Sequence, residues 1–298
     1  MAVAIVGSTF AAGGAAQALP RLHDVVPGLP NGSLGVPVMP ALPIPPAVPK
    51  AELDESFQRL TGSMAASLPG AVGIAITPVG GDVPISFGNL KTARAWSTMK
   101  VPVAIAAQRA RGSAVTAQEI RAIEASDNAA AEALWRAVGG GRKSVDGVEA
   151  VLREAHDGRT RVASDQDRPR SYPGYTRWAL TDQSIFAAHL PCLPDGADVL
   201  DYMAHTDKNQ RWGVSNPKSP GVTAAVKGGW GPVSNTDGRQ VVRQLAVVTT
   251  PRGAYGVSIA ATPKSGSFGD GAAMVSRVGR WWLRNIDEFP AGVCGPLG

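Results

Sequence analysis

The chain has 298 residues, of which 44% are hydrophobic and 18% are charged. This is enough apolar material for a sizeable core, which excludes disorder throughout the chain. The 29 basic and 24 acidic residues give a net charge of +5, and they form no block of like charges of the kind that a nucleic-acid-binding protein concentrates on one face. With only two cysteines, a disulfide-dense miniature scaffold and a cysteine-rich zinc module are excluded as well. The composition therefore predicts a globular protein that does not bind nucleic acid.

Residues 1–18 are predicted to form a secretory signal peptide. An apolar run of small residues ends there in the A-x-A pattern Ala16, Gln17, Ala18, which suits cleavage after Ala18. The usual positive segment at the start is missing, because the first basic residue is Arg21, and a buried amino-terminal helix is the alternative. The run is too short and too rich in glycine for a stable membrane span. We therefore expect an exported protein, either secreted or in the cell envelope.

Residues 19–49 are predicted to be a proline-rich linker. They hold nine prolines and almost no charge, and each proline fixes φ, removes a hydrogen-bond donor and disfavours helix in the residue before it. An extended, partly polyproline II segment follows from this composition. The alternative is that its aliphatic residues wrap along the folded domain.

The remaining chain alternates between helical and strand-like patterns. Helical spacing appears over 54–66, and a hairpin is predicted from 72–77 and 84–87 around a Gly-Gly-Asp turn at 80–82. Five further helices are predicted before residue 200, over 97–111, 117–125, 129–138, 144–155 and 182–189. After Trp212 the pattern becomes strand-like over 223–229, 240–250 and 255–262, and a helix over 272–286 follows.

This order predicts an α/β (α+β) domain over 50–298, in which an antiparallel sheet is flanked by helices and interrupted by an all-helical insertion. The α/β lobe is expected to comprise about 50–95 and 212–298, and the helical lobe about 96–211. We expect one composite enzyme-sized domain that acts as a monomer.

The first motif that suggests chemistry is S-x-x-K, formed by Ser97 to Lys100 at the start of a predicted helix. Positions i and i+3 share a helix face, so the lysine amine can lie beside the serine hydroxyl and remove its proton. Such a lysine must be neutral when it acts, which requires burial or a nearby positive charge. A second copy at Ser215 to Lys218 contains Pro217, which opposes a helix there.

Two more short motifs follow in the chain. Ser126, Asp127 and Asn128 precede a helical run, where such residues commonly cap a helix, although capping and catalysis are compatible. Lys227, Gly228 and Gly229 follow the strand-like TAAV and, taken alone, are typical of a strand that ends in a turn. The three motifs in this order are much harder to explain by chance than any one of them.

Together, the S-x-x-K, S-D-N and K-G-G motifs resemble the boxes of the penicillin-recognising serine hydrolases, the superfamily of class A β-lactamases and DD-peptidases. The resemblance extends over roughly residues 50–290. It includes AWSTMKV around Ser97, VTAQEIRAIEASDNAAAEALWRAVGG around Ser126, and the strand, Pro-Arg-Gly turn, strand and terminal helix after Lys227.

The resemblance implies a role for each matching residue. Ser97 would be the acyl-accepting nucleophile, Lys100 its base, and Ser126 the proton relay to the leaving group. On the binding side, Asn128 would position Lys100 and the substrate amide, and Lys227 would attract a substrate carboxylate. Gly229 and Trp230 would complete the substrate-binding strand, with the backbone N–H groups of Ser97 and Trp230 forming an oxyanion hole.

The sequence departs from the family pattern in three places. Gly228 replaces the usual Thr or Ser, which removes a hydroxyl that grips the carboxylate. The interval from Ser97 to Ser126 is 29 residues, about half of that expected for class A enzymes. No E-x-x-L-N glutamate lies between His156 and Pro173, where Asp165, Gln166 and Asp167 occur instead, and this puts fast β-lactam turnover in doubt.

No metal or other cofactor is expected, because the four histidines show no H-x-x-x-H spacing. In an exported chain, a disulfide between Cys192 and Cys294 is favoured over two buried thiols. The predicted function is that of an exported serine hydrolase that forms an acyl-enzyme on Ser97 with β-lactams or D-Ala-D-Ala-type peptides. The alternatives are a DD-carboxypeptidase or esterase, or a catalytically weakened penicillin-binding or cell-wall-binding domain.

Overall fold

The computed structural model describes residues 50–164 and 173–295, which are built around a five-stranded antiparallel sheet. The strand order is β2-β1-β7-β6-β5. The strands are β1 (Gly70–Pro78), β2 (Ile85–Gly88), β5 (Thr223–Pro232), β6 (Gln240–Thr250) and β7 (Gly253–Pro263). β3 (Thr92–Arg94) and β4 (Arg177–Ala179) pair in a separate small sheet. The predicted signal peptide and linker lie outside the described residues.

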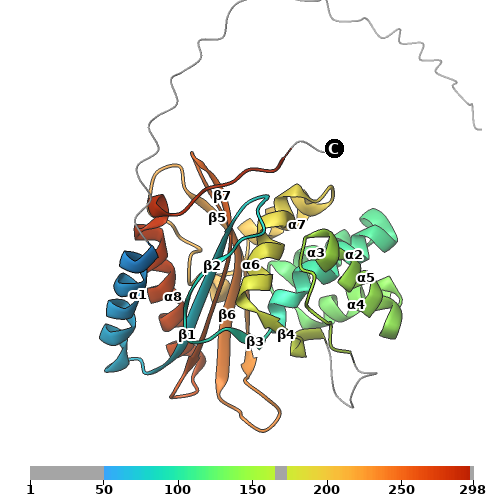
Figure 1. The fold of residues 1–298 in the computed structure, drawn as a ribbon. Helices are drawn as coiled ribbons and strands as arrows, with labels where there is room; N and C mark the ends of the chain where they lie inside the picture. Colours follow the sequence, from blue (N-terminus) through green and yellow to red (C-terminus); the bar gives the residue numbers. More distant parts are fainter. Residues whose placement is uncertain (1–49, 165–172, 296–298) are drawn as a thin grey trace, which may run out of the picture. The chain divides into compact units, whose positions relative to one another are not determined.

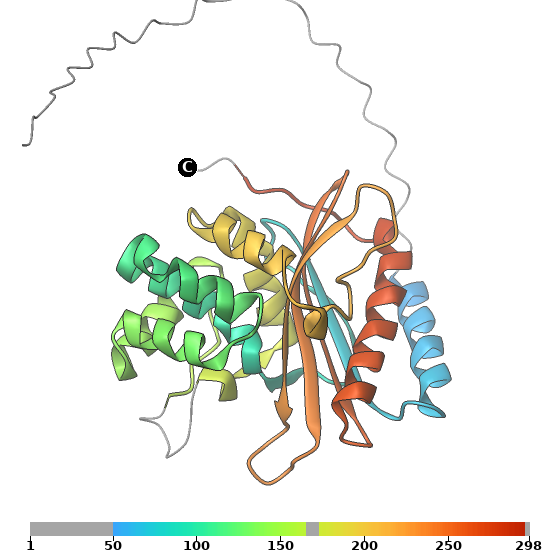
Figure 2. The same cartoon turned by 180° about the vertical axis from the view of Figure 1, so that it is seen from behind.

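Helices cover both faces of the sheet (Figures 1 and 2). α1 (Lys50–Ala65) and α8 (Phe268–Arg284) lie on one face, and α6 (Leu180–His189) packs on β1 and β7 on the other. Beyond α6, the helical lobe contains α2 (Lys100–Arg111), α3 (Thr116–Ile123), α4 (Asn128–Val138), α5 (Gly141–Glu154) and α7 (Gly196–Ala204). The predicted fold class is therefore confirmed.

Two apolar cores hold these layers together. Between the sheet and the α1–α8 layer, the rings of Phe57, Phe87 and Trp281 lie with their centroids 4.9–5.6 Å apart. Within the helical lobe, buried aliphatic residues such as Ile105 and Leu152 pack around Trp178 and Phe186. β6 is buried over most of its length. Its interior polar residues Arg243 and Gln244 are buried with it and donate hydrogen bonds, as buried polar groups require.

The structure modifies several predicted boundaries. Residues 96–99 form a 3₁₀ turn, and the α-helix begins only at Lys100. β5 continues past the K-G-G motif to Pro232, so Lys227 lies within the strand, because β6 pairs with β5 along its whole length. The nine-residue helix α7 and the β3–β4 pair were not predicted, since their short sequences lack a long periodic pattern. The second S-x-x-K copy lies in a loop, as its proline predicts.

Cys192 and Cys294 form a disulfide, with their Cα atoms 5.4 Å apart, which confirms the favoured pairing. It ties the residues that follow α6 to the carboxy-terminal segment. No helix within the described ranges is long and apolar enough to cross a membrane.

Candidate active site

Three elements bring the predicted site residues together. Ser97 lies in the 3₁₀ turn Trp96–Met99, and Lys100 is the first residue of α2. Asp127 caps α4 by accepting a hydrogen bond from the backbone N–H of Ala130 at 2.9 Å, which places Ser126 and Asn128 on either side of the cap. The predicted capping role of this motif is confirmed, and it coexists with a position in the site.

Two residues beside these catalytic candidates adopt a backbone conformation that is unusual for a side chain other than glycine. Trp96, directly before Ser97, has φ of 48°, and Ser126 has φ of 58°. Each such residue costs on the order of 1 kcal/mol or more and persists where the surrounding structure imposes it. The strain therefore lies at Ser126 itself and at the residue before Ser97; the third described residue of this kind, His156, lies outside the site.

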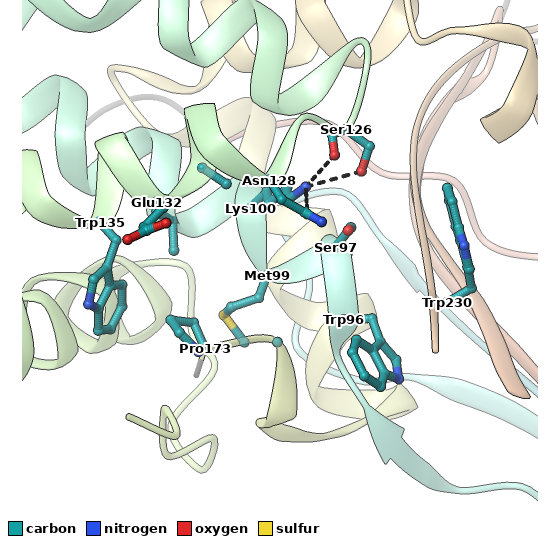
Figure 3. Close-up of a pocket in the computed structure, with 13 residues that line it drawn as sticks. Trp96, Ser97, Met99, Lys100, Ser126, Asn128, Glu132, Trp135, Pro173 and Trp230 are labelled. Carbon is teal, nitrogen blue, oxygen red and sulfur yellow. Dashed lines mark hydrogen bonds between the residues drawn. The ribbon is translucent and has the colours of Figure 1, made fainter. Parts of the chain in front are cut away.

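Lys100 is buried, with 8% of its surface exposed. Its amine donates hydrogen bonds to the Ser126 carbonyl oxygen at 2.5 Å, to Asn128 Oδ1 at 2.8 Å and to Ser126 Oγ at 3.3 Å (Figure 3). Burial lowers the pKa of Lys100 to about 8, against the opposing effect of the nearby Asp127 carboxylate. A substantial fraction of this amine is therefore neutral near neutral to mildly alkaline pH.

Lys227 enters the same network from β5. Its fully buried amine donates to Ser126 Oγ at 2.9 Å, to the Gly228 carbonyl oxygen at 3.0 Å and to Gln210 Oε1. Burial, and secondarily the charge of Lys100, holds the pKa of Lys227 well below its usual value. The Ser126 hydroxyl thus accepts hydrogen bonds from two lysines, which leaves its own proton free to be donated elsewhere.

Ser97 faces a pocket of about 570 Å³ that also contains Lys100, Ser126, Asn128 and Trp230. Among the described residues, the Ser97 hydroxyl has no hydrogen-bond partner. The remaining lining residues are mostly apolar: Trp96, Met99, Val103, Ala131, Glu132, Trp135, Pro173 and Gly174. The described lining contains no histidine or cysteine, and Glu132 is the one carboxylate in it. Glu132 is therefore the one lining residue of a type that commonly binds metal ions.

Lys227 and Gly229 do not line the pocket but lie directly behind it. A Cβ atom on Gly229 would lie 2.9 Å from the Ala95 carbonyl oxygen and 3.1 Å from the Ser97 backbone nitrogen. The absence of a side chain therefore lets β5 approach the turn that carries Ser97. β5 is also an edge strand, which leaves one side of its backbone unpaired by β6 and turned toward this turn.

The expected departures from the family pattern have structural counterparts. The side of Gly228 that would carry a hydroxyl is filled, because a Cβ atom there would lie 2.9 Å from Trp212 Cζ2. Only α2, a short 3₁₀ turn and α3 separate Ser97 from Ser126, which accounts for the short interval. Glu132 forms an ion pair with Arg136 one turn further along α4. Asp165, Gln166 and Asp167 lie outside the described residues.

No pattern in the sequence predicts the buried amides that support the site. Besides accepting from Lys227, Gln210 donates to the backbone carbonyl oxygen of Glu124 at 2.7 Å. Gln183 donates to Thr98 Oγ1 at 2.9 Å and accepts from Arg243 Nη2 at 2.6 Å. These residues come from separate elements, so only the tertiary structure could identify them.

The fold is that of the class A β-lactamases. The chromosome-encoded β-lactamase of Vibrio parahaemolyticus superposes with a TM-score of 0.61 at 16% identity, over 80% of this chain and 100% of that one. The putative class A β-lactamase PenP of Rhodopseudomonas palustris gives 0.57 at 20% identity, over 77% and 98%. A β-lactamase of Sphaerobacter thermophilus gives 0.57 at 19% identity, over 79% and 98%.

No protein-family model and no curated protein matches the chain by sequence. The likeness therefore establishes the fold, and the chemistry must be argued from the site residues.

Proposed function

We propose that this protein is a serine hydrolase that forms an acyl-enzyme on Ser97. The observation that carries the proposal is the hydrogen-bonded chain from Lys100 through Ser126 to Lys227, at the base of the pocket that Ser97 faces. A buried amine with a lowered pKa, a hydroxyl held between two amines and an uncommitted serine hydroxyl are the parts that acyl transfer requires.

In the proposed reaction, Ser97 Oγ attacks the carbonyl carbon of a substrate amide, and its proton passes to the neutral amine of Lys100. The C–N bond then breaks, and the leaving nitrogen takes the proton of Ser126, which is replaced by the proton held on Lys100. Water then cleaves the resulting ester of Ser97 and returns the serine hydroxyl. The oxyanion would be stabilised by the backbone N–H groups of Ser97 and Trp230.

The substrate class that the site favours is a small molecule or peptide with a carboxylate, such as a β-lactam or a D-Ala-D-Ala-type peptide. Lys100 lines the pocket, and the buried Lys227 lies behind it and reaches it through Ser126. An approaching carboxylate would favour the protonated form of Lys227, while neutral Lys100 serves as the base. Trp96, Trp135 and Trp230 offer apolar surface for the rest of the molecule.

Slow deacylation distinguishes a penicillin-binding or DD-peptidase type of protein from a β-lactamase. The carboxylate of Glu132 is paired with Arg136, and Gly228 provides no hydroxyl. The pairing of Glu132 leaves it poorly disposed to activate the deacylating water, which favours a long-lived acyl-enzyme, and the missing hydroxyl weakens the grip on a substrate carboxylate. Both features favour the DD-carboxypeptidase, esterase or weakened-binding alternatives over rapid β-lactam turnover.

The test is intact-mass measurement after incubation with a labelled penicillin. We expect one covalent adduct in the wild type and none in Ser97→Ala or Lys100→Ala. Circular dichroism should show that Lys100→Ala keeps the fold. Absence of an adduct in the wild type, or an equal adduct in Ser97→Ala, would contradict the proposal. An adduct that persists for hours favours a penicillin-binding type, and rapid loss favours a β-lactamase.

We further infer that the protein is exported and acts in the secreted fraction or the cell envelope. The Cys192–Cys294 disulfide supports this, since structural disulfides persist mainly in oxidising compartments. Cell fractionation, with the mature amino terminus determined by mass spectrometry, tests both the location and cleavage after Ala18.

A further inference from the structure

Two histidines and an aspartate converge at a place that has no part in the pocket. Asp82 lies in the connection between β1 and β2, His156 follows α5, and His189 is the last residue of α6. Asp82 Oδ1 lies 2.8 Å from His156 Nδ1 and 2.8 Å from His189 Nε2. The two imidazole rings are stacked, with centroids 3.8 Å apart and an interplanar angle of 23°. Both rings thus present a nitrogen to the same carboxylate oxygen.

We propose that Asp82, His156 and His189 form a binding site for a divalent transition-metal ion of the zinc type. Their three ligand atoms lie within 4.8 Å of one another. A tetrahedral zinc ion with bonds of about 2.0–2.1 Å holds its ligand atoms roughly 3.4 Å apart. The ion therefore fits once the two 2.8 Å contacts to Asp82 Oδ1 lengthen and one imidazole turns. Two imidazoles and a carboxylate select zinc, cobalt or nickel over calcium or magnesium, which prefer all-oxygen sites.

The distribution of exposure suits such a site. The His189 side chain is 9% exposed and serves as the fixed ligand, whereas the side chains of His156 and Asp82 are 51% and 59% exposed. The nearly parallel rings require one imidazole to turn so that both lone pairs point at the ion, and His156 is free enough to do so. The open side leaves the fourth position to water.

The backbone around the three ligands is firmly held. The Gly80 N–H donates to the Ala188 carbonyl oxygen at 3.1 Å, which joins the β1–β2 connection to the end of α6 beside His189. Asp157, next to His156, accepts from Trp178 Nε1 at 2.8 Å and from the Thr160 N–H at 3.0 Å. A bound ion would therefore cross-link the sheet, α5 and α6 within an existing frame, and its effect would be on stability.

The experiment uses the untagged full chain, stripped with EDTA and titrated with zinc chloride by calorimetry. Free thiols do not compete, because both cysteines of the chain are in the disulfide. We expect one equivalent of Zn²⁺ to bind and the melting temperature to rise by about 5 °C at a hundredfold excess over Kd, with no rise in Mg²⁺. Cobalt in place of zinc should give the visible absorption of a low-symmetry site.

Asp82→Asn and His156→Ala change exposed side chains, and each should weaken Zn²⁺ binding by at least about tenfold. The matched control is His205→Ala, because His205 is also exposed and has an aspartate, Asp201, one turn away, but no second histidine. No saturable binding, binding retained in both ligand variants, or an equal loss in His205→Ala would overturn the proposal. Acylation of Ser97 should be unchanged in all three variants, which separates this test from that of the proposed function.

Discussion

At the scale of single residues, the protonation of Lys100 controls the proposed chemistry. Its amine is buried beside a second buried lysine, and the pKa of Lys100 is lowered to about 8 chiefly by burial. Asp127 acts in the opposite direction, because its negative charge favours the protonated amine. Asp127, which caps α4, therefore also raises the pKa of Lys100, the proposed base.

The rate of Ser97 acylation should rise with pH through about 8, because the neutral form of Lys100 is the base. The neutral fraction of a group with this pKa falls about 50-fold from pH 8 to pH 6, and the acylation rate should fall by a similar factor. Stopped-flow measurements with a fluorescent penicillin check this.

Asp127→Asn supplies the matched control for this pH profile. Asparagine caps helices as well as aspartate does, so α4 should keep its start while the negative charge beside Lys100 is removed. The rise in rate should then move to lower pH. A flat profile between pH 6 and 8, or a shift to higher pH in Asp127→Asn, would contradict the assignment of Lys100 as base.

At the scale of elements, the contact between β5 and the 3₁₀ turn of Ser97 shapes the site. Two consecutive glycines, Gly228 and Gly229, leave β5 without side chains where it passes close to Trp212 on one side and to the backbone of residues 95–98 on the other. The strand can therefore bring Lys227 to Ser126 and hold its own backbone beside Ser97.

Gly229→Ala should slow acylation by about 10- to 100-fold, because the added Cβ atom would lie 3.0 Å from the Thr98 backbone nitrogen and would push β5 away from Ser97. Gly238→Ala, in the β5–β6 connection, is the control, since a Cβ atom there meets nothing within 4 Å. Acylation kinetics and far-ultraviolet circular dichroism of both variants measure the effect. Equal rates in the two variants would show that the close approach does not matter.

At the scale of the whole molecule, the disulfide and the sheet unite segments that are distant in sequence. Cys192 and Cys294 are 102 residues apart, and β1 pairs with β7 across a still longer separation, from Pro78–Tyr255 to Gly70–Pro263. Residues before and after the helical lobe therefore share one sheet, and the carboxy-terminal segment is tied to the end of α6.

Replacing both cysteines by serine should lower the free energy of unfolding by about 2–4 kcal/mol, because the cross-link restricts the unfolded chain. The melting temperature should fall by roughly 5–15 °C, and calorimetry of the oxidised wild type and the double variant measures the change. Acylation of Ser97 should persist below the melting transition, since neither cysteine lines the pocket. An unchanged melting temperature would mean that the cross-link contributes no net stability.

The fold class, most of the helices and the strands of the sheet could be predicted from the amino-acid sequence. So could five residues that line the pocket, namely Ser97, Lys100, Ser126, Asn128 and Trp230, whereas the predicted Lys227 and Gly229 lie behind it. These predictions were possible because periodic apolar patterns report the local backbone, and because the order of three short motifs identifies an arrangement that none of them identifies alone. The cap at Asp127 was predictable because Ser, Asp and Asn are common at the start of a helix. The disulfide was predictable because a chain with two cysteines allows only one pairing.

Three features could be seen only in the folded molecule: the 3₁₀ turn that holds Ser97, the hydrogen bond between Lys227 and Gln210, and the meeting of Asp82, His156 and His189. Each of these depends on contacts between residues of different elements, and no local spacing records such contacts. The three members of the proposed metal site are separated by 74 and 33 residues, so a search for closely spaced histidines does not find them. Their convergence follows from the way α5 and α6 end against the β1–β2 connection.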